Sequence, residues 1–160
     1  MYYHVFTSKF GDIALLANEQ GLTELSFQQG NVPIDIKAEY QHAPEKFTQV
    51  CEQLTEYFDG KRTEFDIKLA PVGTQFQKQV WQALQKIPFG KTSSYGELAN
   101  SIDNPKAVRA VGTANGANKI AIIIPCHRVI GANKTLTGYA GGLDLKAKLL
   151  SLEGAEFKAK

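Results

Sequence analysis

The sequence predicts an α/β fold of the α+β kind, in which a small antiparallel sheet with one helix precedes a mostly helical region. Three short apolar segments near the N-terminus, separated by glycine-containing turns, indicate the sheet. Further along, apolar stripes recur at helical spacing, and two of them follow capping-box sequences. Pro71-Val72-Gly73 is typical of a domain joint. We therefore expect one domain over residues 1–71 and a second over residues 72–160.

The N-terminal elements follow from local patterns. We expect an antiparallel meander of three strands at residues 2–7, 12–18 and 22–28. After a loop at residues 29–44, apolar residues at helical spacing predict a helix over residues 45–58, and Gly60 stands where a C-cap glycine belongs. Cys51 falls on the apolar stripe of this helix, as a small core residue. Alternation over residues 65–69 predicts a strand that returns to the sheet.

Two capping boxes begin the helices of the second domain. They are Thr74-Gln75-Phe76-Gln77 and Ser94-Tyr95-Gly96-Glu97. Trp81 lies beside the apolar stripe of the first helix, which predicts a core residue. The second helix should end at Ile102.

A further helix is expected over residues 106–114. Asn104 would be its N-cap and Pro105 its first helical residue. Two short helices joined by a tight turn are typical of a helix-turn-helix, here winged-helix-like. Leucines at helical spacing predict a last helix that ends at Glu153-Gly154.

Composition and charge limit the classes of function. Of the 160 residues, 43% are hydrophobic and 21% are charged, as in an ordinary globular protein. Residues 1–71 hold 6 Lys and Arg against 11 Asp and Glu, a net charge of −5, whereas residues 72–160 hold 12 against 5, a net charge of +7. This asymmetry favours nucleic acid as the partner of the second half, although the two halves could also attract one another. Small residues and two cations on the third helix fit approach to a DNA groove.

Localisation is predicted from what the sequence lacks. There is no apolar run long enough to span a membrane and no signal-peptide pattern, so we expect a cytoplasmic protein without a membrane partner. Cys51 and Cys126 are then expected as free thiols. His4, His42 and Cys51 lack the spacing of metal ligands, and we expect neither a metal nor a cofactor.

The stretch over residues 122–130 is the candidate reactive site. It places Cys126, His127 and Arg128 in an apolar run that should be buried, after a predicted strand that stops at Pro125. Burial in apolar surroundings makes a thiol inert, whereas basic neighbours lower its pKa and make it a nucleophile. A core strand has no use for so many polar groups, so we interpret the stretch as a site.

A nucleophilic thiol needs a base, and the base needs an orienting group. His127 is the candidate base, although neighbouring side chains on a strand point to opposite sides, so contact requires a bend or a bridging water. Glu153 is the candidate orienting residue, because a carboxylate is unfavourable at a helix C-terminus unless it has a partner. The alternatives are a core histidine and a solvated helix end. The same constellation would also suit a thiol hydrolase, which has no need of a helix-turn-helix.

Several motifs together resemble one family, the methylated-DNA–protein-cysteine methyltransferases, also called O6-alkylguanine-DNA alkyltransferases. These motifs are Pro125-Cys126-His127-Arg128-Val129, Arg109-Ala110-Val111-Gly112, Asn118, Gly138-Tyr139-Ala140-Gly141-Gly142 and Leu149-Leu150 to Glu153-Gly154. The resemblance extends from about residue 73 to residue 157. Residues 1–70 resemble the variable N-terminal domain of the family in outline, which implies a ribonuclease-H-like fold.

The resemblance implies direct repair of alkylated DNA. An alkyl group on guanine O6, or on thymine O4, in double-stranded DNA would pass irreversibly to Cys126. His127 would be the base, acting through a water, Glu153 would orient it, and Asn118 would tie the recognition helix to the active-site segment. The alternative is a DNA-binding lesion sensor or regulator that uses Cys126 as an alkylation reporter. We expect the protein to act as a monomer.

The resemblance also implies how DNA is bound. The helix-turn-helix would enter the minor groove, Arg109 would fill the gap left by a flipped nucleotide, and Tyr95 would assist the rotation. We assign the remaining DNA contacts to Lys106, Ala107, Thr113 and Arg128. The base pocket would be lined by Tyr139, Ala140 and Gly141. Ala140 replaces a serine of some members, so a hydrogen bond to the base would be lost there or come from the backbone.

Overall fold

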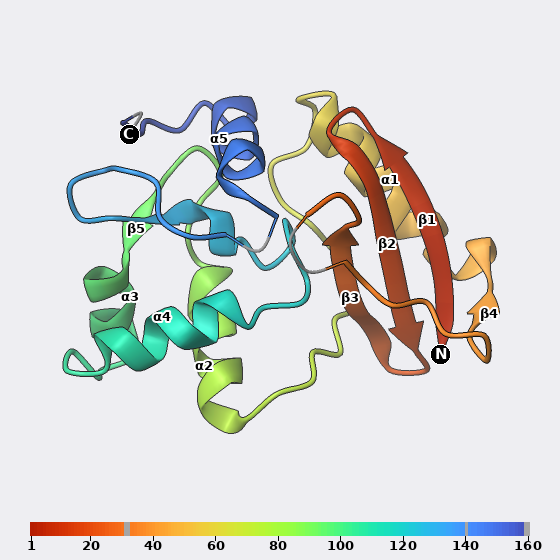
Figure 1. The fold of residues 1–160 in the computed structure, drawn as a ribbon, viewed down its shortest axis with the longest axis horizontal. Coiled ribbons are helices and arrows are strands. Elements are labelled where there is room, and N and C mark those ends of the chain that lie inside the picture. Colours follow the sequence, from red (N-terminus) through yellow and green to blue (C-terminus); the bar gives the residue numbers. More distant parts are fainter. Residues whose placement is uncertain (31–32, 140, 159–160) are drawn as a thin grey trace.

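The computed structural model describes residues 1–30, 33–139 and 141–158. The sheet and its helix lie beside a group of helices formed by the second half of the chain (Figure 1). The predicted mixed fold is confirmed. Within the described ranges, none of the helices has the length and apolarity needed to cross a membrane.

The N-terminal sheet has the order β3-β2-β1-β4. Its strands are β1 (Tyr2–Ser8), β2 (Gly11–Asn18), β3 (Gly21–Phe27) and β4 (Gln41–His42). The first three form the predicted antiparallel meander, and β4 pairs in parallel with β1. The strand β2 lies between β1 and β3, and its residues 13–17 are all buried. This strand is therefore the centre of the N-terminal core.

Helix α1 (Thr48–Phe58) packs beside the sheet and begins later than predicted. A 3-10 turn, η1 (Pro44–Phe47), precedes it. Gly60 has φ +75°, as expected of a glycine after a helix end. Cys51 is partly buried at the edge of the core, where burial raises the pKa of its thiol.

The strand predicted over residues 65–69 is wrong. Among the described residues, an isolated bridge between Leu69 and Leu22 is all the strand pairing that joins this segment to the sheet. Side chains of α1 explain the difference, because Gln53 Oε1 accepts a hydrogen bond from the backbone N–H of Asp66, and Gln49 Nε2 donates to the carbonyl of Asp66. These contacts satisfy backbone groups that a sheet would otherwise use.

The second half contains four helices among the described residues. They are α2 (Gln75–Leu84), α3 (Tyr95–Ser101), α4 (Val108–Gly116) and α5 (Leu143–Leu152). Both predicted capping boxes are present, at Thr74 and Ser94. A short parallel pair, β5 (Ser93–Ser94) with β6 (Val129–Ile130), connects α3 to the active-site segment.

The helix-turn-helix is formed by α3 and α4, which pack against each other. The predicted start of α4 is wrong, since its N-cap is Ala107, without a side-chain hydrogen bond. Asn104 instead begins a separate turn, in which its carbonyl accepts a hydrogen bond from Ala107 N. Lys106 therefore lies in the turn, ahead of the helix.

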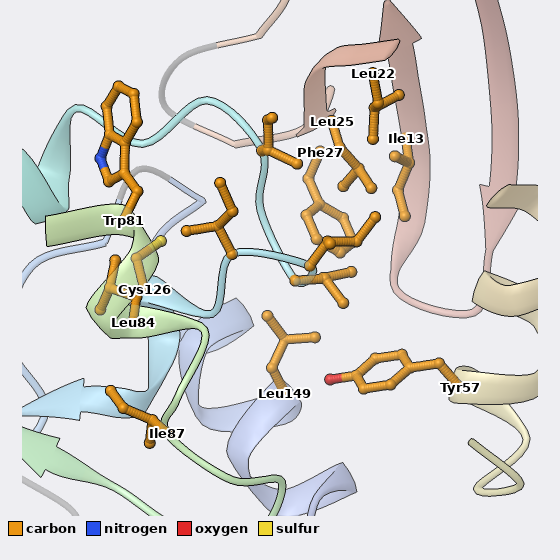
Figure 2. Packing of buried hydrophobic residues seen from close by; sticks show 14 of the residues in the cluster. Ile13, Leu22, Leu25, Phe27, Tyr57, Trp81, Leu84, Ile87, Cys126 and Leu149 are labelled. Atoms are coloured by element: carbon orange, nitrogen blue, oxygen red, sulfur yellow. The ribbon is translucent and has the colours of Figure 1, made fainter. Parts of the chain in front are cut away.

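One hydrophobic cluster spans both halves of the chain (Figure 2). Trp81 is buried in it, as predicted, and donates a hydrogen bond from Nε1 to the carbonyl of Ala114. The edge of β3 also holds the segment after α4, because Leu25 N donates to the carbonyl of Lys119 and Ala121 N donates to the carbonyl of Leu25. The N-terminal sheet thus fixes the start of the segment that carries Cys126.

Candidate active site

The buried strand predicted before Pro125 is not formed, although every residue from 122 to 130 is buried; within this stretch the structure has a strand at Val129–Ile130, β6. Residues 121–123 form a turn in which Ile122 has φ +68°. After Pro125, residues Cys126–Arg128 form one turn of 3-10 helix, η2. A helical turn does not alternate its side chains between two faces, so the geometric objection to cooperation between Cys126 and His127 no longer applies.

Asn118 fastens this segment to the end of α4. Its Nδ2 donates to the carbonyl of Ile124 at 2.8 Å and to Cys126 Sγ at 3.2 Å. Its Oδ1 accepts from Ile120 N at 3.0 Å. A single amide side chain therefore closes the turn and also contacts the thiol.

Cys126 is a free cysteine and is 6% exposed. Burial raises the pKa of its thiol, and the hydrogen bond from Asn118 and the positive charge of Lys146 oppose that effect. The thiol thus remains protonated at neutral pH, and a nearby base must remove its proton for nucleophilic chemistry.

The two residues that the sequence offered as candidate base and candidate orienting group, His127 and Glu153, are in contact. His127 Nε2 lies 2.8 Å from Glu153 Oε2, and both side chains are fully buried. Arg128 also binds this carboxylate, with Nε donating to Oε1 at 2.8 Å and Nη2 donating to Oε2 at 3.1 Å. Glu153 is the C-cap residue of α5, so its unfavourable place at a helix end is offset by cationic and N–H partners.

Electrostatics assign the hydrogen atoms of this pair. Burial alone would raise the pKa of Glu153, but the hydrogen bonds and charges of His127 and Arg128 lower it to about 2. Burial lowers the pKa of His127, against the raising effect of Glu153. Because the ionised carboxylate can only accept, the neutral imidazole donates from Nε2. His127 Nδ1 is then the basic atom, and it is buried without a hydrogen-bond partner among the described residues.

Arg128 does not fit its predicted contact with DNA. Its side chain is 7% exposed, binds Glu153 and donates from Nη1 to the carbonyl of Ile87 at 2.7 Å. The guanidinium also lies over the ring of Phe89, 5.9 Å from its centroid. A buried carboxylate requires such a partner, so Arg128 is committed to the interior.

The other predicted DNA contacts belong to the helix-turn-helix and differ in exposure. Lys106, Arg109 and Thr113 are exposed, and Ala107 is half-buried. Tyr95 is half-buried between α3 and α4, where its hydroxyl lies 2.6 Å from Thr137 Oγ1. The structure therefore brings these five residues to the same helix-turn-helix, with Lys106 and Ala107 in the turn between α3 and α4.

A pocket of about 500 Å³ lies beside Cys126. Tyr139 lines it, and its hydroxyl is buried with no hydrogen-bond partner in the described part of the chain. Gly141 packs tightly behind Tyr139, since an added Cβ would come within 2.9 Å of the tyrosine ring. Ala140, the third predicted pocket residue, lies outside the described residues.

Sequence reasoning missed several residues around this site. Residues 33–35, with Lys37 and Tyr40, line the pocket from the N-terminal half, and no local pattern marked them. Lys146 is fully buried and donates to the carbonyls of Val129 and Thr137, and burial lowers its pKa to about 8. Its place on the leucine stripe of α5 was a usable signal.

Tyr57 was missed as well. From the last turn of α1 it donates a hydrogen bond to Glu153 Oε2 at 2.6 Å. Helical spacing indicates that it is buried, but no local pattern indicates a partner 96 positions away.

Comparisons with known proteins agree with this site. Residues 75–155 match the DNA binding domain of 6-O-methylguanine DNA methyltransferase, and residues 1–71 match its ribonuclease-like domain. A methylated-DNA–protein-cysteine methyltransferase of Methanosarcina acetivorans is 54% identical over 97% of this chain and 99% of its own length. A constitutive methyltransferase of Bacillus subtilis, with the same family name, is 42% identical over 99% of each chain.

A solved structure has nearly the same fold. The crystal structure of Mycobacterium tuberculosis OGT in complex with DNA has a TM-score of 0.89 and 46% identity, and the match covers 96% of this chain and 93% of that one. Fold and site define a DNA-binding protein with a cysteine acceptor. The chain belongs to the methylated-DNA–protein-cysteine methyltransferase family.

The buried role of Arg128 predicts a large effect on stability. Arg128→Met should lower the free energy of unfolding by about 3–5 kcal/mol, because it leaves the Glu153 carboxylate buried with fewer partners. Arg62→Met is the matched control, since Arg62 forms a partly exposed pair with Glu56 and should change stability by less than about 1 kcal/mol. Urea unfolding measures both. Equal small losses would show that Arg128 is not a structural residue.

Proposed function

We propose that the protein repairs alkylated DNA directly, by irreversible transfer of an alkyl group from guanine O6 to Cys126. This proposal rests on one observation: His127, which contacts Glu153, stands next to Cys126, and Cys126 lines the pocket. Relatives throughout the family are named for the same transfer to cysteine. A lesion sensor has no need of a buried base beside its cysteine, so this arrangement favours repair over sensing.

The transfer is a single displacement. The Cys126 thiol gives its proton to His127 Nδ1, through a bridging water as the family resemblance implies, because no direct hydrogen bond joins the two side chains among the described residues. Sγ then forms a bond to the alkyl carbon as the bond from that carbon to O6 breaks. The electrons of the broken bond stay on O6 of the nucleobase, which is restored as guanine when it takes up a proton. The thioether is stable, so each molecule acts once.

Glu153 assists this step through charge. The imidazolium formed on His127 is stabilised by the ionised carboxylate, whose pKa of about 2 keeps it charged at any physiological pH. Asn118 contributes a hydrogen bond that favours the thiolate over the thiol. No cofactor is needed in this scheme, because DNA supplies the alkyl group and the cysteine accepts it.

Double-stranded DNA is the proposed partner. A buried thiol cannot reach a base inside the duplex, so the alkylated nucleotide must be flipped into the pocket beside Cys126. The exposed residues of the helix-turn-helix supply the cations, with Lys106 at phosphates and Arg109 in the gap left by the base. Tyr95 assists the rotation. The solved complex of the M. tuberculosis relative with DNA supports this assignment.

The pocket residues complete the proposal. Burial raises the pKa of Tyr139, so its hydroxyl stays protonated and can donate a hydrogen bond to the flipped base. Gly138 lines the pocket beside Tyr139, Gly141 packs against the ring of Tyr139, and Ala140 is assigned to the same wall by resemblance alone. O4-alkylthymine is the further substrate to test.

Organisation and location are proposed on the same basis. We retain a boundary between residues 71 and 72, supported by the two family matches that end at residue 71 and begin at residue 75. We place the protein in the cytoplasm, where it can reach DNA, and we propose that it acts as a monomer.

Cys126→Ser should abolish repair. Intact-protein mass spectrometry after mixing with O6-methylguanine duplex should show one added methyl group per wild-type molecule, located on Cys126, and none on the variant. Cys51→Ser is the matched control and should accept the methyl group normally, because Cys51 is remote from the pocket. Transfer by Cys126→Ser, or many turnovers per molecule, would overturn the proposal.

Arg109→Ala should slow repair of duplex DNA by about 10- to 100-fold, since extrusion of a base costs a few kcal/mol that the inserted side chain offsets. Reaction with free O6-methylguanine base should stay within about twofold, because no extrusion is needed. Arg62→Ala, in the N-terminal half, should leave both rates unchanged. Single-turnover kinetics measure each rate, and equal losses on the two substrates would contradict the proposed role.

A further inference from the structure

Tyr57 links the N-terminal half of the chain directly to the proposed catalytic pair. It is fully buried, and its hydroxyl donates to Glu153 Oε2 at 2.6 Å. The same oxygen receives the hydrogen bond from His127 Nε2 at 2.8 Å. A side chain from α1 and the proposed base thus share one carboxylate oxygen.

The ring of Tyr57 is held on several sides. Phe58 and Phe89 approach it edge-on, with centroids at 5.3 and 6.1 Å, and Phe65 packs at 5.5 Å. Figure 2 shows the ring entering from α1, with its oxygen directed toward the region of α5 near Leu149. The aromatic contacts therefore fix the direction in which the hydroxyl points.

The Tyr57 hydroxyl stays protonated and therefore always donates its hydrogen bond. Burial, together with the charge of Glu153, raises the pKa of Tyr57 far above its ordinary value. Its proton therefore stays on the phenol oxygen, and the hydrogen bond to the carboxylate persists across the range in which histidine titrates. A donated hydrogen bond stabilises the charge of Glu153 and weakens the pull of that charge on His127.

We propose that Tyr57 is a positioning residue for alkyl transfer, whose hydroxyl holds the Glu153 carboxylate in place and sets the basicity of His127. This inference rests on the proposed function of the same site. It gives the N-terminal half a chemical role in the reaction, because α1 supplies a group that acts on the base through Glu153.

The other charged and titratable groups near His127 come from η2, from α5 with its C-cap, and from the segment that carries Tyr139. Arg128 follows it on η2, Lys146 and Glu153 belong to α5 and its C-terminus, and Cys126 precedes it. Tyr139 faces Tyr57 and Cys126 from the pocket wall. Tyr57→Phe alters none of these groups chemically, so a change in the titration of His127 reports the loss of the Tyr57 hydroxyl.

The test is the pH dependence of methyl transfer by full-length Tyr57→Phe. The wild-type rate, measured by mass spectrometry with free O6-methylguanine base, should fall at low pH as His127 becomes protonated, with a midpoint below 6.5 because burial lowers its pKa. Without the hydroxyl, Glu153 attracts the imidazolium proton more strongly, so the pKa of His127 rises. The midpoint should move upward by about half a unit, which is about a threefold lower rate on the acid limb.

Two control variants separate this role from a structural one. Val50→Ala removes core packing from the same helix and should lower the melting temperature without moving the midpoint. Tyr2→Phe removes another hydroxyl that donates to a carboxylate, here that of the exposed Glu19. It should change neither the melting temperature nor the midpoint. A midpoint for Tyr57→Phe that equals the wild-type value, or lies below it, would overturn the proposal.

A second substitution keeps the ring and the hydroxyl. Incorporation of 3-fluorotyrosine at position 57 makes the phenol more acidic and strengthens its hydrogen bond, so the midpoint should move downward. An upward shift or no shift would overturn the proposed role. A wild-type protein that takes up no methyl group would instead overturn the proposed function itself.

Discussion

Four hydrogen bonds converge on the carboxylate of Glu153, and the site depends on them. They come from His127, from Tyr57 and from two nitrogens of Arg128. An isolated buried carboxylate would take up a proton, whereas this one stays ionised because each oxygen is satisfied. Its charge selects the tautomer of His127 and leaves Nδ1 free to act as a base. The same contacts join α1, η2 and α5. The hydrogen bonds that hold the proposed catalytic pair therefore also connect the two halves of the chain.

Burial of the thiol follows from the way in which the substrate arrives. Burial raises the pKa of Cys126, which would be a defect in an enzyme that must meet its substrate at the surface. A flipped nucleotide carries its alkyl group into the pocket, so the thiol can remain inside until it is used. Because the thiol of each molecule reacts once, its protection from other reagents matters more than the rapid release of repaired DNA. His127, the proposed base, would then take the proton of the thiol.

Local patterns in the sequence predicted the meander, the capping boxes, the buried Trp81 and the partnership of His127 with Glu153. These patterns failed where contacts made by side chains of other segments determine the conformation or the role of a residue. Residues 65–69 alternate like a strand, but the side chains of α1 take their backbone groups. Residues 122–124 have the apolar character of a strand, but Asn118 accepts a hydrogen bond from Ile120 N and donates to the carbonyl of Ile124, and the chain between them forms a turn. Arg128 was assigned to DNA by charge, whereas a buried carboxylate binds it. Tyr57 had no local signal, because its partner is 96 residues away.

The most direct test of this account is the titration of Glu153 in the free protein. Carbon-13 NMR of the side-chain carboxyl group, assigned by comparison with Glu153→Gln, reports its ionisation without any substrate. The account predicts a pKa of about 2, because the donors from His127, Arg128 and Tyr57 hold the charge in a buried site. A carboxyl group that titrates at 4.5 or above would show that burial outweighs these donors and would contradict the account.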